Sequence, residues 1–221
     1  MGYDWDFTPV VQNAGLLLEG LWGTLAITAA ALAFGLPLGF GGALLRLSGR
    51  PVPSAIGRFY VTLFRSTPPL VLLFWAFYAL PLLIGVRMTP FMAAAATLAM
   101  QSGAFFAEVF RGGIVSIERG QWEAGRALGM GSATLMRRIV LPQAIRRMIP
   151  AFLDRLVELL KTTSLVSAIA YADLLYQAIT LSASTFRPLE IFTAVAAIYF
   201  LVLFSISLLV RRVEARLLAR Q

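Results

Sequence analysis

Five apolar segments constrain this chain more than any other feature of its sequence. They cover approximately residues 21–45, 59–84, 90–115, 156–179 and 191–210. A helix needs about 20 mainly apolar residues to cross the hydrocarbon core of a bilayer, and each segment is long enough. A backbone in lipid must satisfy its own hydrogen bonds, so these spans are expected to be helices. We therefore predict an all-α membrane protein that forms a single transmembrane domain of about five helices over residues 1–221.

The composition agrees with a membrane protein and excludes several kinds of chemistry. Hydrophobic residues make up 59% of the 221 residues, which is too many for an ordinary soluble domain. The chain contains no cysteine and no histidine, so disulfides, thiol nucleophiles and histidine acid–base chemistry are excluded. We expect no catalytic residue, no metal site and no cofactor. The first fifteen residues contain Asp4 and Asp6 but no basic residue, so the first span is expected to be an uncleaved insertion signal.

The arginines predict how the chain is oriented in the membrane, because basic short loops remain on the cytoplasmic side. One side holds arginines that lie between spans one and two, between spans three and four, and after span five: Arg46, Arg50, Arg58, Arg126, Arg137, Arg138, Arg146, Arg147, Arg211, Arg212, Arg216 and Arg220. The other side holds Asp4, Asp6, Glu19, Arg87, Arg187 and Glu190. We predict an extracytoplasmic N-terminus and a cytoplasmic C-terminus. The net charge of +8 then reflects topology, and no nucleic-acid partner is expected.

A basic segment over residues 118–150 lies between spans three and four. Ala124, Ala127 and Leu128 follow helical spacing, and Gly129 interrupts that helix. Pro142 is expected to limit a second short helix. The pattern predicts two short helices joined by a glycine turn on the cytoplasmic side, where a soluble partner could dock. The alternative is an amphipathic hairpin with a basic face that lies in the membrane interface.

Seven positions in this segment, six of which match, correspond to the sequence pattern of a known family. They follow the EAA loop of permease subunits of ATP-binding-cassette (ABC) importers, whose pattern is E-A-A, three residues, G, nine residues, I, one residue, L-P: Glu123, Ala124, Gly125, Gly129, Ile139, Leu141 and Pro142. Gly125 is the one departure, and a glycine here is expected to weaken the first helix by about 1 kcal/mol relative to alanine. The resemblance implies that this is the coupling segment, which sits in a groove of the ATPase subunit.

The resemblance extends over about two thirds of the chain and implies a transport function. Residues 64–81, 107–130 and 159–175 resemble permeases for polar amino acids, which commonly have five spans, and residues 3–7 and 171–173 are most similar to glutamate and aspartate permeases. The chain is thus similar to the permease subunit of an ATP-driven importer in a bacterial inner membrane. The implied partners are a dimer of ABC ATPase subunits, a second permease copy or a homologous permease, an extracytoplasmic solute-binding protein and membrane lipid.

ATP and magnesium are expected on the partner subunit, because the chain has no G-x-x-x-x-G-K-[ST] sequence. Within the importer class, the alternative substrates are compatible solutes or opines. A more distant alternative is an ion channel, for which a repeated pore motif or charge ring is expected. Another is an intramembrane enzyme that uses Glu108, Glu158 or Asp173 as its acid or base.

Polar residues in spans two and three, together with Phe105 between Gln101 and Glu108, are candidates for the substrate pathway, because a charge at membrane depth costs several kcal/mol. The candidates are Arg65, Ser66, Thr67, Gln101, Ser102, Phe105 and Glu108. Arg65 to Thr67 are expected to open span two, where Pro68 and Pro69 impose either a pathway constriction or a plain kink at the helix start. Glu108 either lines the pathway or pairs with Arg111 at i+3.

Span four adds four candidates: Glu158, Lys161, Thr163 and Ser164. Lys161 is the only lysine in the chain. One account pairs it with Glu158 at i,i+3. The other directs its ammonium and the two hydroxyls toward a substrate carboxylate. This family usually has K-D-T-S-L here, and Thr162 replaces its aspartate.

Overall fold

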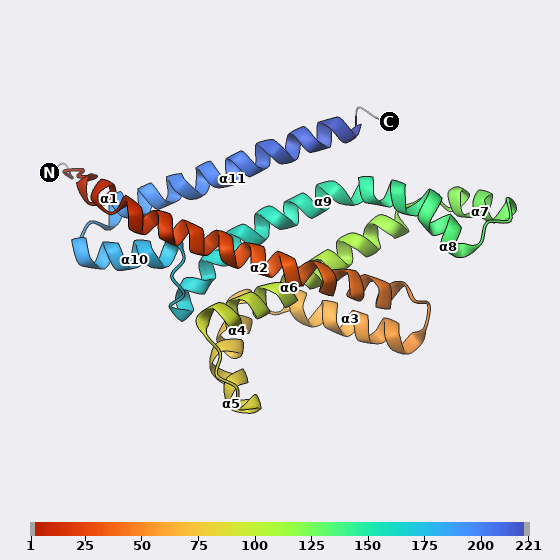
Figure 1. Ribbon diagram of the computed structural model, residues 1–221, viewed down its shortest axis with the longest axis horizontal. Helices are drawn as coiled ribbons and strands as arrows, with labels where there is room; N and C mark the ends of the chain where they lie inside the picture. The colour runs from red at the N-terminus through yellow and green to blue at the C-terminus, as the bar shows by residue number, and fades with distance from the viewer. Residues whose placement is uncertain (1–2, 219–221) are drawn as a thin grey trace. The chain divides into compact units, whose positions relative to one another are not determined.

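The computed structural model describes residues 3–218, in which all regular structure is helical. The prediction of an all-α protein is therefore confirmed. The first half of the chain forms α1 (Thr8–Gln12), α2 (Ala14–Leu47), α3 (Pro51–Ser66), α4 (Pro69–Phe74), α5 (Leu80–Ile84) and α6 (Pro90–Val115). The second half forms α7 (Arg119–Ala127), α8 (Ser132–Leu135), α9 (Leu141–Thr162), α10 (Leu174–Thr185) and α11 (Pro188–Leu218) (Figure 1).

Three of these helices are long and apolar enough to cross a membrane alone: α2, α6 and the Pro188–Leu208 part of α11. Two interrupted pairs pass the same test together, namely α3 with Pro69–Ile84 and Ser132–Ile169 with α10. The described residues therefore hold three to five candidate spans. Helix α6 has the bounds predicted for span three, whereas the helix that contains span four begins well before residue 156.

Two single-turn π-helices connect α-helices, at Trp75–Ala79 and Met136–Val140. Each is followed at once by a leucine and a proline, Leu80-Pro81 and Leu141-Pro142. Proline lacks an N–H and its ring clashes with the carbonyl four residues earlier in an α-helix. The wider π turn relieves this conflict. The expectation that Pro142 limits a short helix is therefore wrong, because the helix continues from Ser132 into α9.

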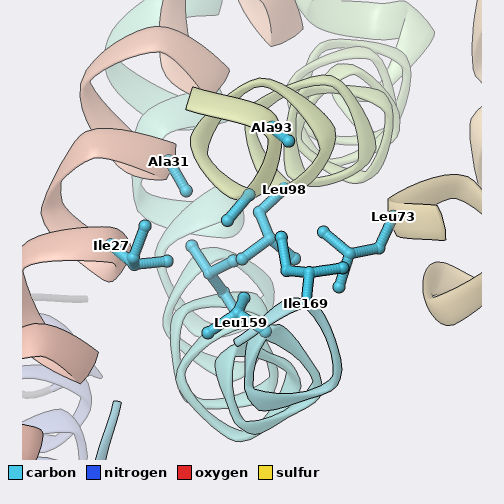
Figure 2. Packing of buried hydrophobic residues seen from close by; sticks show 9 residues of the cluster. Ile27, Ala31, Leu73, Ala93, Leu98, Leu159 and Ile169 are labelled. Atoms are coloured by element: carbon cyan, nitrogen blue, oxygen red, sulfur yellow. The ribbon is translucent and has the colours of Figure 1, made fainter. Parts of the chain in front are cut away.

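The described chain packs as two compact units. One unit contains residues 3–32, 68–98 and 157–209, and the other contains residues 33–67, 99–156 and 210–218. Figure 2 shows the main core of the first unit, in which Ile27 and Ala31 of α2 face Leu98 of α6. Leu159 of α9 and Ile169 of the following 3₁₀ turn (Thr163–Ile169) complete this core. A second core of the same unit joins α2 to α10 and α11 through Leu17, Leu174, Ala178, Leu181, Ile191 and Val195.

Helices α2 and α6 approach each other closely in the second unit. A Cβ atom built at Gly35 would lie 2.5 Å from Ser102 Oγ, and one built at Gly39 would lie 2.6 Å from Phe106 Cβ. Only glycine fits at these two positions without displacing α6. Small residues at this spacing allow close packing in lipid, where no hydrophobic effect draws helices together.

Candidate functional site

The basic segment over residues 118–150 packs on a small hydrophobic core. Buried side chains from the turn after α6, from α8, from the π-helix Met136–Val140 and from α9 form it: Ile117, Leu135, Val140, Ala144 and Met148, with Trp122 of α7 packed against them. Glu123 and Ala124 lie on the exposed face of α7, and Leu128 is 79% exposed at its end. Ile139 and Leu141 are half-buried, and Pro142 is exposed. One surface of the segment is therefore exposed, and the other packs on this core.

Gly129 ends α7 in a geometry that favours glycine. Its φ angle is +71°, in the left-handed region. The Gly129 N–H donates to the Arg126 carbonyl at 2.9 Å, and the Met130 N–H donates to the Gly125 carbonyl at 3.1 Å. These two bonds form a Schellman motif, which satisfies the last carbonyls of the helix. The glycine of the sequence pattern is therefore the residue that turns the chain between α7 and α8.

Gly125 has a packing role that the sequence did not reveal. It is buried, and a Cβ atom built there would lie 2.3 Å from Leu135 Cδ1. The expectation that this glycine only weakens α7 is incomplete, because it also makes room for the buried Leu135 side chain. An alanine at position 125 would require Leu135 to move.

Arg65, Ser66 and Thr67 do not open a helix, as the sequence suggested, but end α3. Thr67 has extended backbone, and α4 starts two residues later at Pro69. The Thr67 N–H and Oγ1 both donate to the Leu63 carbonyl, at 3.2 and 2.8 Å. Arg65 and Ser66 are exposed, and Thr67 is half-buried. These residues therefore lie at a break between two helices, where the prolines prevent the backbone from continuing its hydrogen bonds.

Gln101 of α6 partly replaces the hydrogen bonds lost at this break. It is 6% exposed, and its Nε2 donates to the carbonyls of Phe64 at 3.4 Å and Thr67 at 3.5 Å. Helix ends leave carbonyls unpaired, and these need partners away from water. Ser102 is equally buried, and its Oγ donates to the Ala99 carbonyl at 3.3 Å. Both side chains therefore donate hydrogen bonds to backbone carbonyls of their own compact unit.

Glu108 is the centre of a cluster of guanidinium groups. Its Oε1 pairs with Arg46 of α2 and, at 3.2 Å, with Arg65 of α3, while its Oε2 accepts from Arg111 Nε at 3.0 Å. The predicted i+3 pair with Arg111 is confirmed. The pairs with Arg46 and Arg65 were not predicted, because nothing in the local sequence pattern relates residues so far apart. Glu108 therefore ties three helices together.

Phe105 lies one helical turn before Glu108 and faces two further cations. The guanidinium carbons of Arg65 and Arg155 lie 5.4 and 4.7 Å from the centre of its ring. Both distances are within the range of cation–π attraction. Arg65 therefore interacts with both a carboxylate and an aromatic ring.

The candidates near the end of α9 differ in exposure. Lys161 and Glu158 are exposed. Thr163 is fully buried, and its hydroxyl donates to the Leu160 carbonyl at 2.7 Å. The half-buried Ser164 donates to the Lys161 carbonyl at 2.9 Å. The hydroxyl groups of Thr163 and Ser164 thus donate to backbone carbonyls, whereas the Lys161 side chain is exposed.

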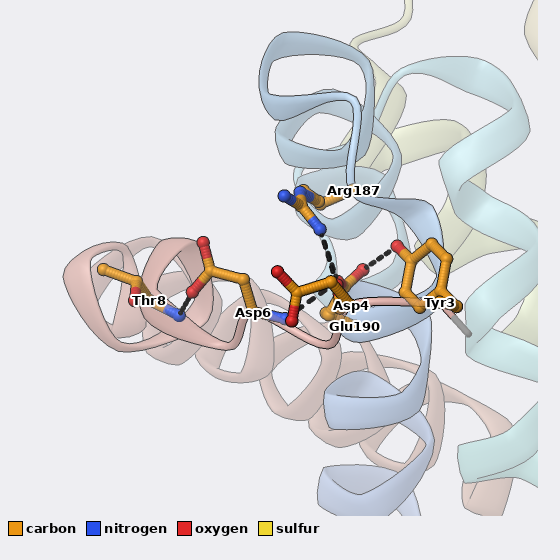
Figure 3. Close-up of polar contacts among 6 residues, drawn as sticks. All are labelled: Tyr3, Asp4, Asp6, Thr8, Arg187 and Glu190. Atoms are coloured by element: carbon orange, nitrogen blue, oxygen red, sulfur yellow. Dashed lines mark hydrogen bonds and ion pairs between the residues drawn. The ribbon is translucent and has the colours of Figure 1, made fainter. Parts of the chain in front are cut away.

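A polar cluster at the N-terminus was missed by the sequence analysis. Figure 3 shows Glu190, which is fully buried, accepting from Tyr3 Oη at 2.8 Å and from Arg187 Nη1 at 3.3 Å. The Asp6 N–H also donates to Glu190, at 3.1 Å, and Arg187 donates to the Asp4 carbonyl. The bond to Glu190 raises the pKa of the Tyr3 hydroxyl, because it stabilises the protonated phenol. The cluster fastens the N-terminal segment to the start of α11.

Asp173, considered above as an acid or base, caps a helix. It is fully buried at the N-cap of α10, where its Oδ1 accepts from the Tyr176 N–H at 2.9 Å. Thr24 Oγ1 of α2 accepts from the adjacent Leu174 N–H at 3.2 Å. Residues 3–218 contain no group of three acidic, histidine or cysteine side chains that could hold a metal ion.

These features define a class: a helical membrane protein that carries a basic helix-turn-helix between two of its apolar helices. A family model described as "Binding-protein-dependent transport system inner membrane component" matches residues 31–219. The chain belongs to this family, whose members are permease subunits of ABC transporters.

Relatives of the chain include permeases with several named substrates. It is 36% identical to the glutamine transport system permease protein GlnP of Escherichia coli (strain K12), over 98% of this chain and 99% of the relative. It is 39% identical to the octopine transport system permease protein OccM of Rhizobium meliloti, over 83% and 78%. It is 32% identical to the arginine transport system permease protein ArtQ of Bacillus subtilis (strain 168), over 96% and 97%.

Two solved structures share the fold. A crystal structure of an amino acid ABC transporter with histidines has a TM-score of 0.92 and 34% identity, covering 97% of this chain and 100% of that one. An inward-facing structure of the MetNI methionine ABC transporter has a TM-score of 0.75 and covers 93% and 98%. At 22% identity, the second likeness concerns the fold alone.

Proposed function

We propose that this chain is the permease subunit of an ATP-driven importer for polar amino acids that an extracytoplasmic binding protein delivers. The observation that carries the proposal is the coupling segment, in which six of the seven EAA pattern positions match, in a chain 36% identical to a glutamine permease. Octopine-type substrates are a second candidate, because the octopine permease is 39% identical. A second copy of this chain or a homologous permease completes the pore.

The exposed face of α7 is the proposed docking surface for the ATPase subunit. Glu123 and Ala124 are exposed there, while Gly125 and Leu135 hold α7 on the core of the segment. The helix that starts at Ser132 continues into α9 as far as Thr162. A movement of the docked ATPase would therefore pass along a continuous helix toward Lys161. Packed rigid elements of this kind transmit conformational change.

We place the coupling segment in the cytoplasm, the N-terminus outside and the C-terminus inside, with each interrupted helix pair counted as one span. The distribution of arginines supports this orientation. ATP and magnesium bind the partner ATPase dimer, which supplies the energy. The protein then resides in a bacterial inner membrane with five spans.

We propose that the substrate pathway uses the exposed members of the candidate set directly. The exposed members lie at a helix break or near a helix end: Arg65, Ser66, Glu158 and Lys161. The buried Gln101, Ser102 and Thr163 support the backbone around them. The half-buried members complete the set: Thr67, Phe105, Glu108 and Ser164.

Reconstitution tests the proposal. The permease is co-expressed with its ATPase subunit, placed in proteoliposomes with ATP inside, and given binding protein and labelled amino acids outside. We expect ATP-dependent uptake of a polar amino acid, and loss of uptake in Glu123→Lys with the ATPase no longer co-purifying. Gln121→Lys, two residues away on the same helix, serves as the matched control. Uptake without ATP, or full coupling in Glu123→Lys, would contradict the proposal.

A further inference from the structure

A groove of about 670 Å³ lies where α2 ends and α3 begins. Its walls are mainly apolar, and its lining residues all belong to one compact unit: Gly41, Leu44, Leu45, Ser48, Arg50 and Pro53. Leu44 is 51% exposed and Leu45 is 38% exposed. A Cβ atom built at Gly41 would have nothing from the surrounding structure within 4 Å, so the groove is open beside this glycine. The volume lies within the range of ligand sites.

The backbone of Arg50 is fixed at the turn between the two helices. Gly49 makes this turn with a φ angle of +66°, in the left-handed region that favours glycine. The Arg50 N–H donates to Ser48 Oγ at 3.4 Å, and the Arg50 carbonyl accepts from the Ser54 N–H at 3.1 Å. Pro51 then starts α3 with a restricted backbone. A rigid turn therefore carries the guanidinium that lines the groove.

The Arg50 guanidinium has no counter-charge in the part of the chain that the structure describes. The sequence contains no aspartate or glutamate between Glu19 and Glu108, and the Glu108 carboxylate is engaged by three other guanidinium groups. Among residues 3–218, no hydrogen bond or ion pair involves the Arg50 side chain. This guanidinium is therefore available to an external phosphate group, which it can bind through two parallel hydrogen bonds.

We propose that the groove binds one anionic phospholipid, with its phosphate on Arg50 and an acyl chain along Gly41, Leu44 and Leu45. Helix α2 is long and apolar enough to cross a membrane, and the groove lies at one end of it. Headgroups and acyl chains meet at such an end. Basic pockets between transmembrane helices on the cytoplasmic side are typical sites for anionic headgroups. The orientation in the proposed function assigns the lipid to the inner leaflet, whereas the binding itself does not depend on that function.

The groove adjoins the contact between α2 and α3. A Cβ atom built at Gly57 of α3 would lie 2.8 Å from Arg46 Cγ and 3.1 Å from Leu45 Cβ, so the two helices pack closely here. Leu45 therefore contacts α3 and also lines the groove. A lipid that binds only the folded hairpin of α2 and α3 stabilises the permease against unfolding.

The test titrates the purified permease–ATPase complex in detergent with phosphatidylglycerol or phosphatidylcholine, and native mass spectrometry counts the bound lipids. We expect one phosphatidylglycerol per permease, with a dissociation constant about tenfold below that of phosphatidylcholine. Arg50→Gln should weaken the binding of phosphatidylglycerol about tenfold, the usual loss for one charge-assisted pair, and leave that of phosphatidylcholine unchanged. Gly41→Leu should prevent binding of both lipids and leave thermal unfolding without lipid unchanged, because its Cβ enters open space.

Arg58→Gln is the matched control, because Arg58 is also exposed and lies on α3 but does not line the groove. An equal effect of Arg50→Gln and Arg58→Gln would overturn the groove in favour of a diffuse basic surface. Unchanged binding in Gly41→Leu, or equal affinities for the two lipids, would also overturn the proposal.

Two further outcomes would assign the groove to another occupant. Displacement of phosphatidylglycerol by an equal concentration of glycerol 3-phosphate would overturn the assignment to a lipid, because the acyl chain would then contribute nothing. Loss of a second permease copy from the Gly41→Leu complex would assign the groove to permease pairing. If the ATPase does not co-purify at all, the proposed function fails, and the same titration of the permease alone still decides the lipid site.

Discussion

The side-chain amide of Gln101 lies 3.4 Å from the carbonyl oxygen of Phe64, so a residue of α6 completes the hydrogen bonding of α3. The same amide reaches the Thr67 carbonyl at 3.5 Å. A helix that ends inside a membrane protein needs such a partner, because lipid offers none. The break at Arg65–Pro69 therefore depends on a side chain that lies more than thirty residues further along the chain.

Replacing Gln101 should destabilise the break. Gln101→Leu leaves two carbonyls without this donor, and we expect the unfolding free energy in detergent to fall by about 1–3 kcal/mol. Thermal unfolding of the purified permease measures the change. Gln177→Leu in α10 is the control, since the described residues give its amide no hydrogen bond. Equal shifts for the two variants would argue against the capping role.

Gly129 should be sensitive to any side chain, because its φ angle is positive. Gly129→Ala is expected to cost about 1–2 kcal/mol, and Gly129→Val more. Gly131 has a φ of −64° and nothing within 4 Å of a built Cβ, so Gly131→Ala should change little. Ligand-stimulated ATP hydrolysis is the readout, together with membrane insertion. We expect Gly129→Val to be inserted but uncoupled, and coupling equal to that of Gly131→Ala would contradict this.

The orientation of the chain can be tested with single cysteines, since the chain has none of its own. Ser132→Cys lies at the exposed start of α8 and Ser184→Cys near the end of α10. A membrane-impermeant maleimide should label position 184 in intact cells and position 132 only after permeabilisation. The unsubstituted protein is the blank. Labelling in the reverse order would require the opposite topology.

Lys161 should matter for transport rather than for folding, because its side chain is exposed. Lys161→Met is expected to reduce uptake about tenfold or more while the ATPase still co-purifies. Glu158→Gln is expected to change the preference among glutamate, glutamine and arginine. Thermal stability and uptake are compared for both variants. Equal loss of stability with an unchanged substrate profile would count against a pathway role.

The sequence predicted the features that depend on residues close to one another in the chain, such as helix bounds and i,i+3 pairs. Apolar length predicted the bounds of α6, and i,i+3 spacing predicted the Glu108–Arg111 pair. The sequence did not predict the pairs of Glu108 with Arg46 and Arg65, because these pairs depend on how three helices pack. The contacts of Glu190 with Tyr3 and Arg187 illustrate the same difference, since the i+3 partner is visible in the sequence and the distant one is not.

Other errors arose from treating proline and glycine as local signals. Pro142 indicated the end of a helix, yet the π turn before it lets the helix continue. Gly125 indicated a weaker helix, yet its missing side chain makes room for Leu135. In both cases the consequence of the residue depends on its surroundings, which propensity does not describe.

The π turn at Met136–Val140 has a consequence for how insertions and deletions are tolerated. Because it holds one more residue per turn than an α-helix, removing one residue there converts it to ordinary helix. The same deletion within α9 would rotate everything on one side by about 100°. A one-residue shortening between Met136 and Val140 is therefore expected to keep α8 and α9 near their present angular phase, and with it the direction in which α7 faces. At this turn the chain can lose one residue without the rotation that the same loss would cause within the regular turns of α9.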